Sequence, residues 1–177
     1  RAKALLVIEE SGLKVQPLVG LATRCNERIT SQEMQQQALL YIGLAQIDST
    51  TGYISKNAEE EPTGTSARFR SGDILFSKLR PYLNKVSICP EHLVEAAGST
   101  ELVTYRANDG VDPYYLFFVL KSPLVLNQVI DITSGSTHPR VAPELIDEVL
   151  VPLAPDADRK AIGASARSAL NLIHRAT

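Results

Sequence analysis

Residues 72–81 read Gly-Asp-Ile-Leu-Phe-Ser-Lys-Leu-Arg-Pro, and residues 133–153 read Thr-Ser-Gly-Ser-Thr-His-Pro-Arg-Val-Ala-Pro-Glu-Leu-Ile-Asp-Glu-Val-Leu-Val-Pro-Leu. Each segment places a short apolar run, which is typical of a strand, beside cations and hydroxyl side chains that are typical of a surface. Neither segment carries a recognisable catalytic motif. This combination favours a surface that reads a polyanion over a pocket that performs chemistry.

The pattern continues outward in both directions as short strands separated by short helices. Strands are expected at 39–47, 74–77, 85–89 and 149–153, and as a pair at 95–98 and 102–105. Helices are expected at 2–10, from Pro113, from Ser122 to Ile130, and from Asp156 onward, with short turns at 30–33 and 143–146. Residues 56–66 are expected to form an exposed loop. This order predicts an α+β fold with a mixed, mostly short-stranded sheet, short helices and a C-terminal helix.

Length and charge narrow the class of protein. The 177 residues suffice for one domain with its own core, and no apolar run approaches the roughly 20 residues that span a bilayer. A net charge of −2 and a pI of about 5.9 argue against a non-specific nucleic-acid coat but allow a local basic face. Cys25 and Cys89 predict reduced packing residues in a cytoplasmic protein. Because the chain begins with Arg1 rather than Met, we expect a fragment of a longer polypeptide.

The sequence offers little for catalysis or metal binding. Residues 112–115, Asp-Pro-Tyr-Tyr, resemble the Asn/Asp-Pro-Pro-Tyr loop of amino-methyltransferases but lack the second proline, and a capped helix start explains them equally well. His92, His138 and His174 show no metal-ligand spacing, and the acidic run at 59–61 is expected to be a solvated loop. We therefore expect no catalytic residue, no cofactor and no metal ion.

A first group of cations falls within 18 positions, with Asp73 alone opposing them in the sequence and Tyr82 among them: Arg68, Arg70, Lys78, Arg80 and Lys85. Strand alternation would place Lys78 and Arg80 on one face. Such a face can contact phosphates or, through arginine, the O6 and N7 edge of guanine. The alternative is a solvated strand edge protected by charge, and the composition leaves both interpretations open.

A second candidate surface consists of polar residues around Gly135, which lets the backbone approach a ligand closely: Ser134, Ser136, Thr137, His138 and Arg140. Hydroxyls can donate to phosphate or contact base edges, and the arginine adds charge. The alternative is an ordinary polar loop between two elements.

Together these segments resemble the target recognition domain of specificity subunits from type I DNA restriction–modification enzymes. The matching features follow in order: 41–47 before the Gly52 turn, 71–77 before Arg80-Pro81 and Lys85, 99–101 before a strand, 113–116 opening a helix, and 135–137 leading to 151–153. The match covers roughly residues 13–170. It implies a target recognition domain at 13–155, preceded by a helix at 1–12 from an earlier spacer or domain, and followed at 156–177 by a spacer helix.

The resemblance implies a non-catalytic domain that recognises one half of a bipartite DNA target and directs a methyltransferase and restriction complex in phage defence. Expected partners are double-stranded DNA, DNA methyltransferase (modification) subunits and a restriction/translocase subunit. Lys78, Lys85 and Arg68 are the expected phosphate contacts. The expected base-edge readers are Arg80, Tyr82, Thr137, His138 and Arg140, with Ser136 in the same interface.

The family usually carries Pro-Pro and Glu-Gln pairs before the spacer helix, where this chain has Ala154-Pro155 and Asp158-Arg159. This departure leaves the exact subfamily open. Two alternatives for the setting and the role of the chain also stay open. The same module also forms the C-terminal domain of single-chain DNA methyltransferases. A rival interpretation is a protein-interaction module of the same fold that serves assembly without reading DNA.

Overall fold

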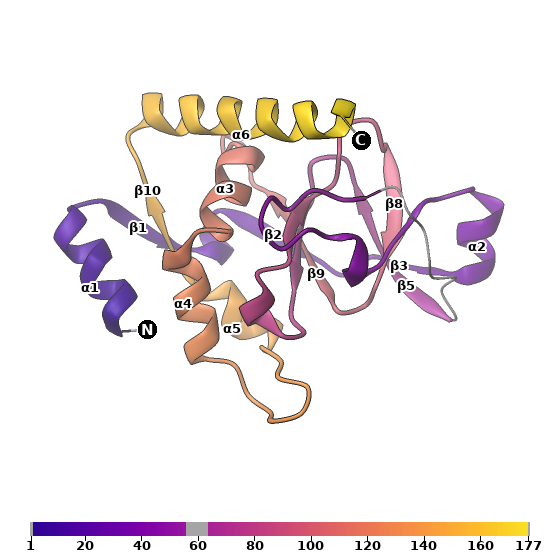
Figure 1. The fold of residues 1–177 in the computed structure, drawn as a ribbon, viewed down its shortest axis with the longest axis horizontal. Helices are drawn as coiled ribbons and strands as arrows, with labels where there is room; N and C mark the ends of the chain where they lie inside the picture. Colours follow the sequence, from indigo (N-terminus) through magenta and orange to yellow (C-terminus); the bar gives the residue numbers. More distant parts are fainter. Residues whose placement is uncertain (1, 56–63, 177) are drawn as a thin grey trace.

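The structure is a computed structural model that describes residues 2–55 and 64–176 (Figure 1). Its strands form three small sheets. One pairs β1 (Lys14–Pro17) with β10 (Leu150–Leu153). A second has the order β2 (Ala22–Cys25), β9 (Leu102–Ala107), β6 (Ile74–Ser77), β7 (Val86–Ile88). The third has the order β3 (Arg28–Thr30), β5 (Thr65–Arg70), β8 (Glu95–Gly98), β4 (Tyr41–Ile42), in which β4 runs parallel to β8.

Helices surround these sheets. The described helices are α1 (Ala2–Ser11), α2 (Ser31–Gln36), α3 (Pro113–Leu120), α4 (Pro123–Asp131), α5 (Pro143–Asp147) and α6 (Asp156–Ala176), with 3-10 turns η1 (Leu18–Gly20), η2 (Leu44–Gln46) and η3 (Pro81–Leu83). The α+β class expected from the sequence is confirmed. In the described part of the chain, no helix combines the length and the hydropathy that crossing a bilayer requires.

The larger core lies between α3, α4 and the sheet that contains β6 and β9. Leu116 and Leu120 of α3 are fully buried there, together with Ile74 of β6 and Tyr105 of β9. Burying side chains of this size contributes about 1.5–3 kcal/mol each. A second core gathers around Phe69 on the other face of the sheets. These two cores fix the positions of β6 and the loops that follow it.

Polar contacts join the helices to the last strand. The side chain of Asp112 accepts hydrogen bonds from the backbone N–H groups of Tyr114 and Tyr115, so residues 112–115 form a capped helix start. The hydroxyl of Tyr115 donates to Pro152 O at 2.9 Å. The buried amide of Gln128 both donates to and accepts from the backbone of Leu150. These bonds satisfy polar groups that burial would otherwise leave unpaired.

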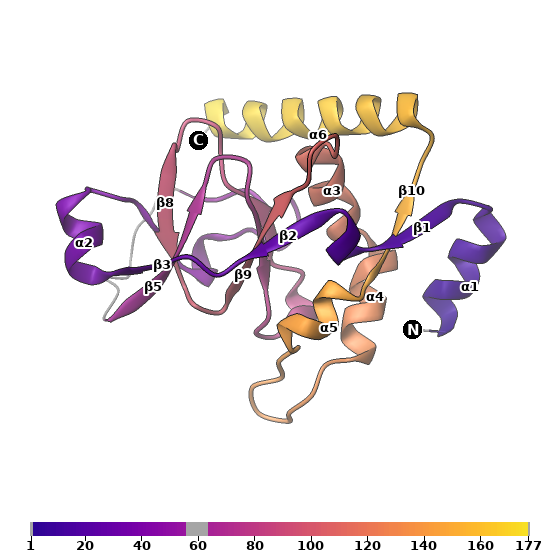
Figure 2. The ribbon, with the colours of Figure 1, turned by 180° about the vertical axis from the view of Figure 1, so that it is seen from behind.

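Helix α6 lies across one side of the molecule and packs on α3 (Figures 1 and 2). Leu170 is buried against the larger core, and Ile162 and Ala166 pack beside it. A methyl group at Gly163 would come within 2.7 Å of the Asp112 carboxyl, so a residue without a side chain permits the close approach. The apolar stripe of this helix therefore packs on its own domain.

Several sequence expectations need correction. Of the strand expected at 39–47, residues 41 and 42 alone form strand β4, because the chain turns into η2, where the Gln46 side chain accepts from Gly43 N–H at 2.7 Å. The strands at 95–98 and 102–105 exist, but they belong to different sheets and do not pair. The turn between them, closed by Leu102 N–H to Ser99 O, directs the chain from one sheet to the next.

Other expectations are confirmed or lie outside the described residues. Thr30 and Glu33 form a reciprocal capping box at the start of α2. Cys89 is fully buried in the second core, and burial raises the pKa of its thiol to about 12. Strands β1, β2, β3 and β5 were not expected from the sequence. Most of the loop expected at 56–66, including the acidic run at 59–61, falls outside the described residues.

Candidate nucleic-acid interface

The segment after β6 pairs with the end of the loop that joins α4 to α5. The backbone N–H of Arg80 donates to Pro139 O at 2.7 Å, and the N–H of Val141 donates to Lys78 O at 3.0 Å. These bonds belong to a short antiparallel bridge. The fold therefore brings one part of the first candidate surface, Lys78 and Arg80, beside the second.

Most of the predicted DNA-contacting residues are exposed at this bridge. We call them the paired-loop surface: Arg80, Tyr82, Ser136, Thr137, His138 and Arg140. Lys78 is half-buried beside them. A hollow of about 350 Å³ separates the two loops and is lined by Leu44, Leu79, Arg80, Leu83, Lys85 and His138. Cations, hydroxyls and an exposed aromatic ring on one surface suit contact with a nucleic acid.

The backbone at Arg80 departs from the strand expected there. Its φ of 47° and ψ of 60° lie in the left-handed region, immediately before Pro81 opens η3. The strand has already ended at Ser77, whose hydroxyl donates to Leu79 O at 2.8 Å. The expectation that Lys78 and Arg80 alternate on one extended face is therefore wrong, because the chain turns between them.

Arg140 is held by Glu101, a residue that was not among the predicted contacts. The Arg140 Nη2 to Glu101 Oε1 distance is 2.9 Å, and Nε lies 3.2 and 3.3 Å from the two carboxylate oxygens. Glu101 is fixed in turn, because its backbone carbonyl accepts from Lys78 N–H at 3.0 Å. The hydrogen bond that Arg140 donates to Glu101 raises the pKa of Arg140 above its usual value.

Lys85 stabilises the fold beside the hollow. Its ammonium donates to Leu44 O at 2.6 Å and to Ile47 O at 3.1 Å, which ties η2 to the start of β7. The ammonium of Lys121 donates in the same way to Ser49 O and Asn84 O at 2.8 Å each, which joins the turn after η2 to the end of η3. Burial lowers the pKa of Lys121 to about 8. Phosphate contact by Lys85 stays a prediction, and its ammonium already has two backbone acceptors.

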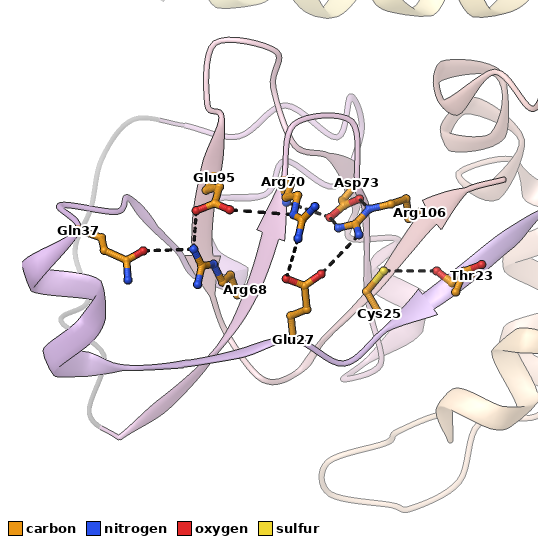
Figure 3. A network of polar contacts seen from close by, with 9 residues as sticks. All are labelled: Thr23, Cys25, Glu27, Gln37, Arg68, Arg70, Asp73, Glu95 and Arg106. Carbon is orange, nitrogen blue, oxygen red and sulfur yellow. Dashed lines mark hydrogen bonds and ion pairs between the residues drawn. The ribbon is translucent and has the colours of Figure 1, made fainter. Parts of the chain in front are cut away.

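Arg68 lies in a different part of the molecule, within a row of ion pairs that joins β5 and β8 to β9 (Figure 3). Its Nη2 lies 2.6 Å from Glu95 Oε2 and 3.2 Å from Gln37 Oε1. Arg70 is 3.4 Å from Glu27. Strand pairing therefore brings Glu27 and Glu95, which lie outside this stretch of sequence, beside the arginines.

Asp73 is the buried centre of that row. Its side chain is 2% exposed and lies 2.7 Å from Arg106 Nη2 and 2.8 Å from Arg106 Nε. It also accepts from the backbone N–H of Arg70 at 2.9 Å. The hydrogen bond to Asp73 raises the pKa of Arg106. This arrangement ties β5 and β6 to β9, and no local pattern around Arg106 indicates that it would join.

The histidine, cysteine and carboxylate side chains do not gather into a metal site in the described part of the chain. Within residues 2–55 and 64–176, no group of three or more His, Cys, Asp and Glu side chains is placed to hold a metal ion. The rings of His92 and His174 lie 5.3 Å apart, edge to face, and Tyr53 lies 4.7 Å from His174. The fold therefore brings His92 and His174 together although they are distant in the sequence.

No protein-family model matches the sequence, and no curated protein matches it. Several solved structures, however, are similar to this chain in fold. An HsdS subunit from Thermoanaerobacter tengcongensis has a TM-score of 0.70 and 24% identity, over 93% of this chain and 44% of that chain. A chain from a structural study of complex assembly and conformational transition of the type I R-M system has a TM-score of 0.68 and 24% identity, over 92% and 43%.

A third structure, the S subunit of a type I restriction–modification system from M. genitalium, has a TM-score of 0.57 and 12% identity, over 86% of this chain and 37% of that chain. The chain thus spans less than half the length of each of these three structures. The fold implied by the resemblance to a target recognition domain is confirmed. The chain has the fold of a segment of the S subunits of type I restriction–modification systems.

Proposed function

We propose that this chain is a non-catalytic, sequence-specific DNA-recognition domain that reads one half of a bipartite target. The observation that carries the proposal is the backbone pairing of Arg80 with Pro139 and of Val141 with Lys78, which gathers the paired-loop surface in one place. Its exposed cations, hydroxyls and tyrosine are the groups with which proteins contact phosphates and base edges.

The contacts divide by chemistry. Lys78 lies at the base of the surface and suits a phosphate contact, which fixes the position of the protein on the duplex. Arg80 and Arg140 carry planar donor groups that suit guanine, and Thr137 and His138 suit base edges at the loop tip. Arg68 and Lys85 have partners within the fold, so we expect smaller contributions from them.

The domain would act within a larger assembly in the cytoplasm. In this role it directs DNA methyltransferase subunits, and a restriction/translocase subunit, to a target sequence, which serves defence against phage. The comparison with HsdS and with the type I R-M assembly supports this setting.

Binding to randomised duplexes tests the proposal. Arg80→Ala or Arg140→Ala should relax the preference at one defined position and cost about 1–3 kcal/mol there. Lys78→Ala should weaken binding to all sequences and reduce the dependence of log Kd on log salt concentration by about 1. If both arginine variants weaken all sequences equally, these arginines contact the DNA backbone and do not read bases.

A second candidate function, assembly without DNA reading, is favoured by a separate observation. An apolar hollow of about 720 Å³ lies between α6 and the α3–α4 junction, and Phe118 at its edge is 53% exposed. Exposed apolar surface of this kind is common where proteins associate. Salt dependence separates the two functions, because phosphate neutralisation makes affinity fall steeply with salt.

A further inference from the structure

The contacts of Arg140 define which edge of its guanidinium remains available. Glu101 accepts from Nε and from Nη2, so it occupies the side of the guanidinium that those two nitrogens share. Nη1 has one long contact, 3.4 Å to His138 O. A guanidinium carries five N–H donors in a rigid plane. One N–H on Nη1 and one on Nη2 therefore have no protein partner among the described residues, and the side chain is 48% exposed.

The carboxylate is itself held in place. Glu101 N–H donates to Ser99 Oγ at 3.2 Å, and Glu101 O accepts from Lys78 N–H at 3.0 Å. Its side chain is 25% exposed, whereas that of Arg140 is 48% exposed. The acid thus lies deeper than the cation it supports. Rotation of Arg140 toward a phosphate would break the pair, so its guanidinium is restricted to one orientation.

The pair also has no net charge. A neutral pair releases few counterions when it meets DNA and so contributes little to non-specific affinity. It keeps its hydrogen-bond donors, however, and two parallel donors at the end of a guanidinium match the O6 and N7 acceptors of guanine. Charge and geometry therefore both favour base reading over phosphate contact at this residue.

We infer that Glu101 is a positioning residue that holds Arg140 for end-on recognition of one guanine in the major groove. This inference rests on the proposed function and deepens it. It assigns a base to the loop, and it names a specificity-determining residue that does not itself touch DNA.

The experiment compares Glu101→Gln with the wild-type full chain on selected and randomised duplexes. Glutamine keeps the shape but loses the charge, so Arg140 is released to contact phosphates. Preference for guanine at one position should fall by about tenfold. The slope of log Kd against log salt should become steeper by about 1. Arg140→Ala should lose the same guanine preference with little change in slope, and Glu101→Asp should partly restore the preference.

Two further measurements sharpen the result. In the wild type, replacing the guanine by 7-deazaguanine removes the N7 acceptor and should cost most of the preference, but it should cost nothing further in Glu101→Gln. Without DNA, the Arg140 Nε–H signal in NMR spectra should exchange slowly with water in the wild type and rapidly in the variant. A merely structural role for Glu101 would alter neither base preference nor salt slope.

Glu91→Gln is the matched control. Glu91 binds Arg167 through the same side of the guanidinium, at 2.8 and 2.9 Å. Arg167 belongs to α6, which lies on the opposite side of the molecule from the 133–140 loop in both ribbon views (Figures 1 and 2). If Glu101→Gln behaves like this control, or loses preference at another base than Arg140→Ala, the inference is overturned. A wild-type chain without any sequence preference would overturn the proposed function as well.

Discussion

Replacing Arg80 with glycine is expected to stabilise the fold while weakening DNA binding. A left-handed backbone costs a residue with a side chain about 1–2 kcal/mol, and Arg80 adopts it at φ 47°. The proline that follows restricts this residue further. Glycine loses about 0.5–1 kcal/mol more conformational entropy on folding. The net gain for Arg80→Gly is therefore about 0.5–1 kcal/mol in the free energy of unfolding.

Alanine at the same position separates the two effects. Arg80→Ala removes the same DNA-contacting group but keeps a side chain on the left-handed backbone, so its stability should remain near that of the wild type. Both variants should lose equal DNA affinity. Equilibrium unfolding in urea measures the first quantity, and duplex binding measures the second.

Arg70 provides the control for this comparison. It lies in strand β5 with its side chain 53% exposed. Glycine in a strand interior is unfavourable, so Arg70→Gly should be less stable than Arg70→Ala, the reverse of the order at Arg80. If Arg80→Gly is no more stable than Arg80→Ala, the strain assigned to this turn is absent.

Two other perturbations test how the fold supports the surface. Asp73→Ala should lower the free energy of unfolding by about 3 kcal/mol, the low end for breaking a buried ion pair, because Arg106 is 37% exposed and can turn toward water; an unchanged urea midpoint would contradict this. Lys121 has a pKa of about 8 in the fold, against 10.5 for the free side chain. Between pH 8 and 10.5 the Lys121 side chain binds a proton in the unfolded chain more often than in the folded chain, so the free energy of unfolding rises with pH in this range. The free energy of unfolding of Lys121→Met contains the pH dependence of the cysteines and tyrosines but not that of Lys121. The difference between wild type and this variant should therefore rise by up to about 3 kcal/mol from pH 8 to 10.5; a difference that stays constant would refute the prediction.

Local signals in the sequence predicted the helices well. Pro113 and Pro123 each open a helix, and both are preceded by residues that favour the N-cap position. The apolar run of β6 is buried along its whole length, so composition alone identifies it. The positions of the paired loops followed from two separate polar stretches, but their pairing did not, because hydrogen bonds between distant backbone groups leave no local pattern.

The unexpected strands carry alternating polar residues that sequence patterns assign to loops. In β5, Arg68 and Arg70 form ion pairs with glutamates, although the side chain of Arg70 stays half-exposed (Figure 3). Their partners Glu27 and Glu95 come from other strands, so the sequence shows a basic cluster where the fold has neutralised pairs. Glu101 was missed for the same reason, since nothing in residues 99–101 indicates which cation it will meet.

The tip of the 133–140 loop is enclosed by its own hydrogen bonds. Ser134 and Arg140 exchange backbone hydrogen bonds at 2.9 and 2.8 Å, which closes residues 135–139 into a small separate loop. Substitutions within this small loop change the side chains offered to a ligand and leave the hydrogen bonds between Ser134 and Arg140 intact. Gly135, at a φ of 92°, resists substitution. At Ser136, Thr137 and His138, however, new recognition properties can arise by point mutation at little thermodynamic risk, which makes these three positions the natural place for the protein to diversify.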